Sequence, residues 1–180
     1  IQLLPDNKAL ATIKEVNAIM EGEAYRRSDS RNQPGGVMFM SDSMIPIIIG
    51  DLHTRLDNLL KILSENMFLE TLEQEKSYLI ILGDAVHSEV EGEMGDMESS
   101  LLIMDFIFKL KIKFPQQVFY LRGNHDSFSK SVGKGGIPQG ILWAKEITKH
   151  RGKEYYQEMN KFYDQLAYVA ISKDFITCHA

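Results

Sequence analysis

Three short apolar runs, rich in β-branched and aromatic residues, recur along this chain, and a glycine followed by a polar residue comes directly after the first two and one residue after the third. The runs cover residues 44–49, 78–82 and 117–121 and end near positions 50, 83 and 122. These intervals are close to the roughly 30 or more residues that one βαβ unit requires. An apolar run without alternation suits a strand buried on both faces, as parallel sheets require. The pattern therefore predicts an α/β fold with a largely parallel core.

The segments around these runs carry helical and turn signals. Apolar residues at helical spacing predict helices at 10–20, 56–63 and 101–110, and residues 141–163 are expected to be helical in parts. Residues 21–36 are polar, end in Pro-Gly-Gly and predict a loop, so residues 1–36 are expected to form a peripheral helix and loop. Residues 167–171 and 175–178 suggest a closing hairpin.

Length and composition limit the possible classes of protein. A chain of 180 residues suffices for one domain, and 44% apolar with 25% charged residues is typical of a globular protein. The net charge of −5 argues against nucleic-acid binding through a broad basic face. Because Cys178 is the only cysteine, no internal disulfide can form. The sequence contains no apolar run of about 18 residues, the length needed to span a bilayer.

Carboxylate, imidazole and amide side chains follow the predicted strand ends, where a parallel sheet gathers its functional groups. They are Asp51, His53, Asp84, Asn124 and His125. A lone Gly-Asp is usually a turn, but Gly-Asn-His-Asp should arise by chance only roughly once in some thousand chains of this length. Such a set of oxygen and nitrogen ligands suits Mn²⁺, Fe or Zn²⁺ better than Ca²⁺ or Mg²⁺. Glycine before each ligand would allow a sharp turn and leave room for a metal ion or a phosphate.

The motif order resembles the calcineurin-like metallophosphoesterase superfamily, in which Asp-x-His, Gly-Asp and Gly-Asn-His-Asp/Glu precede two later histidines. Residues 121–125, Leu-Arg-Gly-Asn-His, are especially similar to the phosphoprotein phosphatase branch. The resemblance implies a β-sandwich flanked by helices, with the metal site at the strand carboxyl ends. It further implies a first metal on Asp51 and His53, a bridging Asp84, a second metal on Asn124 and His179, and His125 as the acid.

By the same resemblance the protein is a hydrolase that uses two divalent metal ions, with Mn²⁺ favoured and Fe or Zn²⁺ as alternatives. A metal-bridging hydroxide would attack phosphorus directly, without a covalent phosphoenzyme. The expected substrate is a phosphomonoester on a phosphoprotein or phosphopeptide, with the choice between Ser/Thr and Tyr open. One alternative is a nucleotide or diadenosine polyphosphate hydrolase of the same fold, and another is a degenerate member that serves as a binding module.

Residues 83–89 depart from the family pattern Gly-Asp-x-Val-Asp-Arg-Gly. His87 stands where an Asp would orient the catalytic histidine, and Ser88 stands where an Arg would grip the phosphate. Asp126 is the expected replacement for the orienting carboxylate. His87 is placed among the substrate-binding residues, and the candidates for the missing positive charge are Arg55, Arg122, Lys130 and Lys134.

Two further departures concern Thr54, which replaces the glycine that usually follows Asp-x-His, and the second metal-binding histidine, which has no counterpart after His179. Residues 37–180 are therefore expected to be the N-terminal part of a metallophosphoesterase domain that continues beyond residue 180. Oligomeric state stays open, and the compartment is left as cytoplasm or, for a secreted effector, outside the cell.

Overall fold

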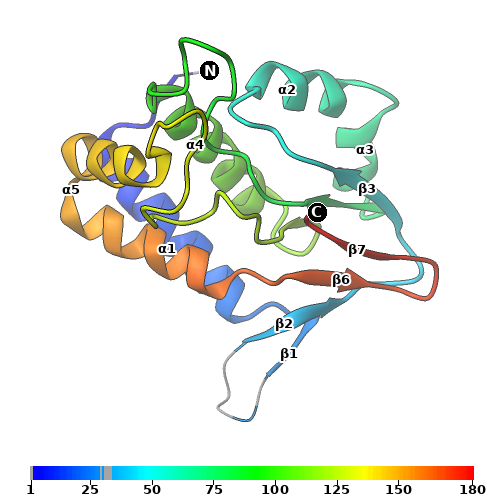
Figure 1. The fold of residues 1–180 in the computed structure, drawn as a ribbon. Coiled ribbons are helices and arrows are strands. Elements are labelled where there is room, and N and C mark those ends of the chain that lie inside the picture. Colours follow the sequence, from blue (N-terminus) through cyan, green and yellow to red (C-terminus); the bar gives the residue numbers. More distant parts are fainter. Residues whose placement is uncertain (1, 29, 31–33) are drawn as a thin grey trace.

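The computed structural model describes residues 2–28, 30 and 34–180 and contains two sheets and five helices in these ranges (Figure 1). The elements in chain order are α1 Asp6–Glu21, β1 Arg26–Ser28, β2 Pro34–Phe39, β3 Ile45–Ile49, α2 Leu56–Ser64, α3 Phe68–Glu73, β4 Ser77–Ile81, α4 Glu98–Lys113, β5 Val118–Tyr120, α5 Gln139–Gln165, β6 Val169–Ile171 and β7 Ile176–Cys178.

The first sheet has the order β3-β4-β5, and both of its strand pairs are parallel. Every residue of the central strand β4 is buried, which explains its unbroken apolar sequence. The connections pass through α2 and α3 and then through α4, as βαβ units require. The predicted α/β fold with a parallel core is confirmed.

The second sheet has the order β1-β2-β6-β7. Strand β2 pairs in parallel with β6, whereas β1 with β2 and β6 with β7 are antiparallel pairs. The predicted closing hairpin is the pair β6 and β7. The predicted loop at 21–36 is corrected in part, because β1 and the start of β2 lie within it; residues 29 and 31–33 lie outside the described residues.

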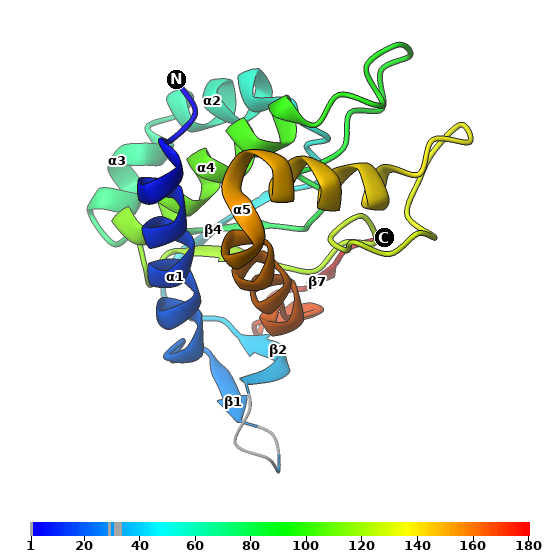
Figure 2. The same ribbon diagram turned by 90° about the vertical axis from the view of Figure 1, so that its left-hand side faces the viewer.

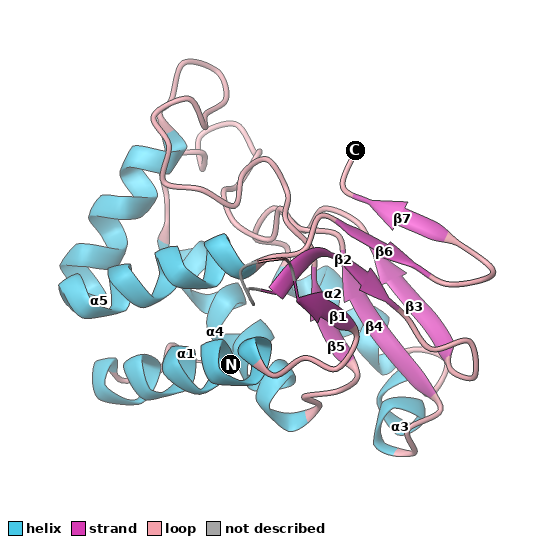
Figure 3. Ribbon diagram, turned by 90° about the horizontal axis from the view of Figure 1, so that it is seen from below, coloured by secondary structure: helices cyan, strands magenta, loops and turns pink. Residues whose placement is uncertain are grey.

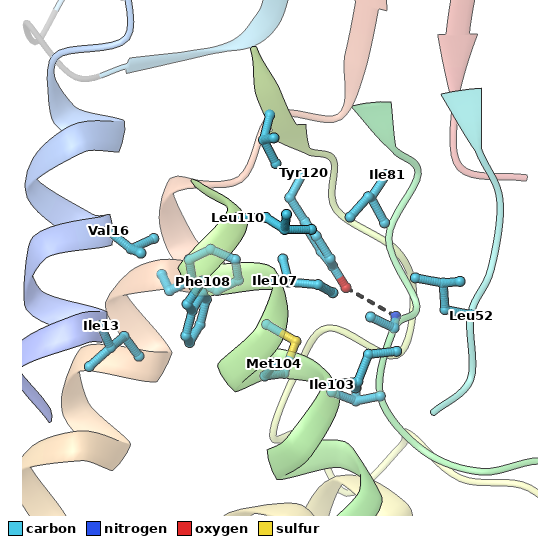
Figure 4. Packing of buried hydrophobic residues seen from close by; sticks show 14 of the residues in the cluster. Ile13, Val16, Leu52, Ile81, Ile103, Met104, Ile107, Phe108, Leu110 and Tyr120 are labelled. Atoms are coloured by element: carbon cyan, nitrogen blue, oxygen red, sulfur yellow. Dashed lines mark hydrogen bonds between the residues drawn. The ribbon is translucent and has the colours of Figure 1, made fainter. Parts of the chain in front are cut away.

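Helices α1, α4 and α5 lie to one side of the strands (Figure 3), and β4 contributes residues to two hydrophobic cores. Leu79 and Ile81 point into a large core shared with the helices, and Tyr78 and Ile80 pack against residues of the second sheet. Alternate residues of β4 therefore pack into two different hydrophobic cores, one on each face of its sheet. Figure 4 shows the helix side, where Tyr120 lies among apolar residues with its hydroxyl on the backbone nitrogen of Ala85.

The sequence had suggested that the first helix is peripheral. In the structure, helix α1 is instead part of this core. It runs beside α5 (Figure 2), and its Ile13 and Val16 are completely buried. Helix α5 is interrupted at Gly152, whose φ of 82° is not helical, so the expectation of a region that is helical in parts is confirmed. None of the helices in the described ranges is long and apolar enough to cross a membrane.

Candidate metal centre

The carboxyl ends of the strands bring the predicted ligands to one edge of the molecule. Asp51 comes two residues after β3, Asp84 three residues after β4, and Asn124 four residues after β5. His179 follows β7 directly, so the second sheet also contributes to this edge. Residues that lie more than 120 positions apart in the chain therefore meet because parallel strands end on the same side.

Three of the predicted ligands form a compact group. Asp51, Asp84 and His179 each offer one ligand atom, and these atoms lie within 4.8 Å of one another. Asn124 joins them through its Oδ1, which is 2.7 Å from Nε2 of His179. His53 lies at the side of the group, with Nε2 3.8 Å from a carboxylate oxygen of Asp51. All five predicted metal ligands are thus neighbours.

The orientation of both imidazoles fits a metal ion. Nδ1 of His179 lies 3.1 Å from the carbonyl oxygen of Leu82, and Nδ1 of His53 lies 3.0 Å from the carbonyl oxygen of His87. A proton on each Nδ1 would satisfy these carbonyls and leave the Nε2 lone pairs facing the group, as in most metal-binding histidines. The lone pairs of His179 Nε2 and Asn124 Oδ1 then meet at 2.7 Å, an arrangement that a cation between them would stabilise. The residues present therefore fit a divalent metal.

The loops that carry these ligands are joined to each other by their backbones. The amides of Leu52 and His53 both donate to the carbonyl oxygen of Asp84, at 3.1 and 2.9 Å. The loops at Gly83 and Gly123 are packed closely together. A Cβ on Gly83 would lie 2.3 Å from the backbone nitrogen of Gly123, and a Cβ on Gly123 would lie 2.0 Å from Oδ1 of Asp84. Glycine at these two positions is needed for loop packing. At Gly50 a Cβ would meet nothing within 4 Å, so loop packing does not require glycine there.

His125, the candidate acid, is fixed beside Asp84, the predicted bridging carboxylate. Its backbone N–H donates to Oδ1 of Asp84 at 2.7 Å, and its ring meets the ring of His53 edge to face at 5.2 Å between centroids. Its Nδ1 lies 3.2 Å from Nδ1 of His87. Burial lowers the pKa of His125 below the usual histidine value.

His87 lies behind His125 and is completely buried, so it does not form part of a substrate-binding surface as expected from the sequence. Burial, followed by the charges of His125 and His53, lowers the pKa of His87 to about 3, which leaves this imidazole neutral. Its ring stands edge to face with Trp143, whose indole N–H donates to the hydroxyl of Tyr163. The structure thus places His87 in contact with the candidate acid.

Asp126 is buried beneath the candidate ligands and does not take the orienting position expected from the sequence. Its carboxylate accepts hydrogen bonds from the amides of Gly123 and Asp84, at 2.8 and 3.2 Å, and from the Tyr120 hydroxyl at 2.9 Å. Burial raises the pKa of Asp126 to about 6. In this position Asp126 holds the loops after β4 and β5 together.

Neither of the predicted phosphate-binding arginines has its side chain among the candidate ligands. Arg55 is exposed and pairs with Asp57 at 3.2 Å, and Arg122 donates to the carbonyl oxygen of Tyr163 at 2.7 Å. Ser88, which stands at the family's arginine position, is buried and its hydroxyl lies 3.3 Å from Oε2 of Glu93.

Sequence reasoning missed two residues that the structure places at the centre. Oε1 of Glu89 lies 3.4 Å from Nε2 of His53. The Tyr120 hydroxyl donates to the carboxylate of Asp126 and accepts from the backbone N–H of Ala85. Glu89 is one of several acidic residues in a polar loop, and Tyr120 is part of an apolar strand. Nothing in the local sequence distinguished either of them from its neighbours.

A hollow of about 540 Å³ lies at the other end of the parallel strands and is lined by Tyr25, Met44, Phe114 and Gln117 among others. Met44 and Gln117 directly precede β3 and β5, so this hollow is separated from the ligands by the length of the sheet. It has no part in the chemistry considered below.

Residues 46–180 match the family model of the calcineurin-like phosphoesterases. The chain belongs to this family. The predicted superfamily is thereby confirmed, and membership implies divalent metal ions as cofactors. None of the curated proteins matches the sequence.

Among solved structures, this calcineurin-like phosphoesterase chain resembles a protein serine/threonine phosphatase from Saccharomyces cerevisiae that has similarity to human phosphatase PP5. The TM-score is 0.65 at 16% sequence identity, so the likeness shows the fold. The match covers 98% of this chain and 48% of the yeast protein. The chain therefore spans about half the length of the phosphatase it resembles.

Proposed function

We propose that this calcineurin-like phosphoesterase hydrolyses phosphomonoesters on proteins or peptides, with two divalent metal ions at the edge described above. The observation that carries this proposal is the group Asp51, Asp84 and His179, whose ligand atoms lie within 4.8 Å, with His125 hydrogen-bonded to Asp84. The fold shared with a serine/threonine phosphatase supports a phosphoprotein substrate. Manganese is the favoured metal because the donors are a mixture of carboxylate, imidazole and amide groups.

The ligands divide as the family pattern suggests. Asp51 and His53 would hold one ion, Asn124 and His179 the other, and Asp84, which is buried at the centre, would bridge them. Bound there, the ions would supply Lewis-acid activation of water and compensate the negative charge of the phosphoryl oxygens. The protein's own contribution is to fix these ligands and to deliver a proton to the leaving oxygen.

His125 is the proposed proton donor, and its contact with His87 decides which nitrogen carries the proton. The two Nδ1 atoms are 3.2 Å apart, and for two neutral rings one hydrogen would lie between them. If His125 supplied it, neutral His87 would keep its own proton on Nε2, which is buried and has no hydrogen-bond partner among the described residues. A buried N–H without an acceptor costs about 1 to 3 kcal/mol.

The favoured arrangement is therefore the one in which His87 donates from Nδ1. His125 is then neutral, with its hydrogen on Nε2, the nitrogen remote from His87. To act as an acid, His125 takes up a second proton at Nδ1, and the hydrogen bond reverses, so that this Nδ1–H donates to Nδ1 of neutral His87. The Nε2–H of the His125 imidazolium can then pass to an alkoxide or phenoxide leaving group, which leaves His125 neutral. His87 thus acts as a positioning residue in place of the usual aspartate.

The test is release of phosphate from phosphoserine, phosphothreonine and phosphotyrosine peptides with Mn²⁺, compared with release from diadenosine polyphosphates. Faster turnover of the peptides supports the proposal, whereas faster turnover of the dinucleotides favours the alternative hydrolase. Asp84→Asn should abolish turnover because the bridging carboxylate is lost. Metal binding without turnover of any of these substrates would identify a degenerate binding module instead.

A further inference from the structure

One lysine reaches the metal-binding edge from a turn that lies outside the family motifs. Nζ of Lys134 forms an ion pair with Oε1 of Glu89, and the same oxygen lies 3.4 Å from Nε2 of His53. One carboxylate oxygen therefore contacts both the lysine and a predicted metal ligand. Positive charge is thus available directly beside the place where a substrate phosphate would bind.

The backbone of Lys134 is held in a tight hairpin turn. Its N–H and C=O both pair with Ile137, at 3.3 and 3.0 Å, across Gly135 and Gly136. These two glycines have φ of 58° and 81°, the left-handed conformation that such turns need at both central positions. The lysine therefore projects from a defined point of the loop after β5.

The side chain of Lys134 is free to change partner. Lys134 and Glu89 are 46% and 39% exposed, and an ion pair this accessible contributes little to stability. The dianion of a phosphomonoester offers more charge and more acceptor oxygens than one carboxylate, and hydrogen bonds between ionised groups are the strong ones. A bound phosphate can therefore displace Glu89 from the lysine.

Of the other expected cations, Arg122 binds a backbone carbonyl and Arg55 pairs with Asp57. Lys130 is exposed, and of the two lysines only Lys134 forms an ion pair with Glu89 among the described residues. We propose that Lys134 binds the phosphate group of the substrate, and that Glu89 holds Lys134 until phosphate displaces it. Lys134 would thus replace the arginine that this chain lacks at Ser88. The inference rests on the proposed function for the nature of the ester, but inorganic phosphate tests it without any turnover.

The experiment is a calorimetric titration of inorganic phosphate into the full chain at saturating Mn²⁺. Lys134→Met should weaken phosphate binding about tenfold or more, because a charge-assisted hydrogen bond is lost, whereas Lys134→Arg should retain most of the affinity. Lys149→Met, which removes an exposed lysine of α5, is the matched control and should bind phosphate as the wild type does. The proposal would be overturned if Lys134→Met bound phosphate as tightly as the wild type does. It would also be overturned if Lys130→Met lost affinity tenfold and Lys134→Met did not.

Glu89→Gln tests the second half of the proposal. Loss of the competing carboxylate should tighten phosphate binding about threefold or more, and this gain should disappear when Lys134→Met is also present. An equal gain in both backgrounds would mean that Glu89 acts only by general charge repulsion, which would refute its role as the holder of Lys134. Turnover is measured separately, so absence of phosphatase activity would contradict the proposed function and leave the phosphate-binding result standing.

Discussion

Nδ1 of His87 lies 3.2 Å from Nδ1 of His125, so a buried neutral imidazole occupies the place that phosphoprotein phosphatases give to an aspartate. An aspartate would add negative charge behind His125, whereas His87 adds none. It can still form one hydrogen bond to Nδ1 of His125, donating to the neutral ring and accepting from the imidazolium, and this bond fixes the orientation of His125. The relationship between these two rings separates this chain from the family pattern more than any other feature of the site.

The first prediction concerns the leaving group. His87→Leu removes the hydrogen-bond partner of His125 Nδ1 but keeps an apolar side chain, so His125 loses its fixed orientation and the acceptor for the Nδ1–H of its imidazolium. Hydrolysis of a phosphoserine peptide should fall by about 10²-fold in kcat, because an alkoxide needs the proton, with little change in KM. Hydrolysis of 4-nitrophenyl phosphate, whose leaving group needs little protonation, should fall much less.

Two comparisons separate this role from a general structural one. His87→Asn keeps an N–H donor at the same position and should retain more activity on the phosphoserine peptide than His87→Leu. His125→Ala should show the same dependence on the leaving group as His87→Leu. Equal losses on both substrates in His87→Leu would show that the ring serves only to fill the core.

The second prediction concerns metal binding and stability. The carboxylates of Asp51 and Asp84 lie in one group with His179, and a cation would stabilise them in the folded state alone. Mn²⁺ at 100 times its dissociation constant should raise the free energy of unfolding by about 2.7 kcal/mol. Asp84→Asn should lose most of this increase, measured by thermal denaturation with and without chelator. Asp57→Asn, which alters a carboxylate paired with Arg55 on the surface, should keep it, and a loss there would contradict the site.

The third prediction concerns backbone strain at Thr54, where relatives usually have glycine. Its φ is 67°, a left-handed conformation that a β-branched residue rarely adopts. Thr54→Gly should stabilise the protein by about 1 kcal/mol, since relief of strain exceeds the greater entropy of glycine in the unfolded chain. Urea denaturation would measure this gain. Thr54→Ala removes the branch but keeps Cβ, so it should gain less; a destabilised Thr54→Gly would mean that the conformation is not strained.

The fourth prediction concerns the pH dependence of stability in the metal-free protein. Burial raises the pKa of Asp126 to about 6, above that of an unfolded aspartate. The folded state then binds the proton more tightly, so this group's stabilisation is complete below pH ~4 and is lost as pH rises through about 6. The loss can reach about 3 kcal/mol, since one pKa unit corresponds to about 1.4 kcal/mol.

Asp126→Asn imitates the protonated carboxyl group, with an oxygen for the amides of Gly123 and Asp84 and an N–H for the Tyr120 hydroxyl. The difference in unfolding free energy between wild type and Asp126→Asn, measured in urea with chelator, should therefore shift in favour of the variant from pH 4 to pH 7. A difference that is constant over this range would show that Asp126 does not titrate there.

The fold and the ligand set followed from local sequence because both depend on short-range patterns. The apolar runs at 44–49, 78–82 and 117–121 predicted β3, β4 and β5, and the polar residues behind them lie at one edge because parallel strands share their direction. The strands β1 and β2 escaped prediction because β1 is polar and β2 begins with proline and two glycines. Their pairing with each other and with β6, rather than their own sequence, makes them strands.

The sequence by itself therefore determined the α/β architecture and the placement of Asp51, Asp84 and Asn124 at one edge of the sheet, and the family resemblance added His179 to them. Only the tertiary structure decided the places of the residues around them. It buried His87 against His125, placed Asp126 beneath the loops, and brought Lys134 to Glu89. The physical reason is that a side chain's burial, hydrogen-bond partners and pKa depend on groups distant in the chain, which no local spacing encodes.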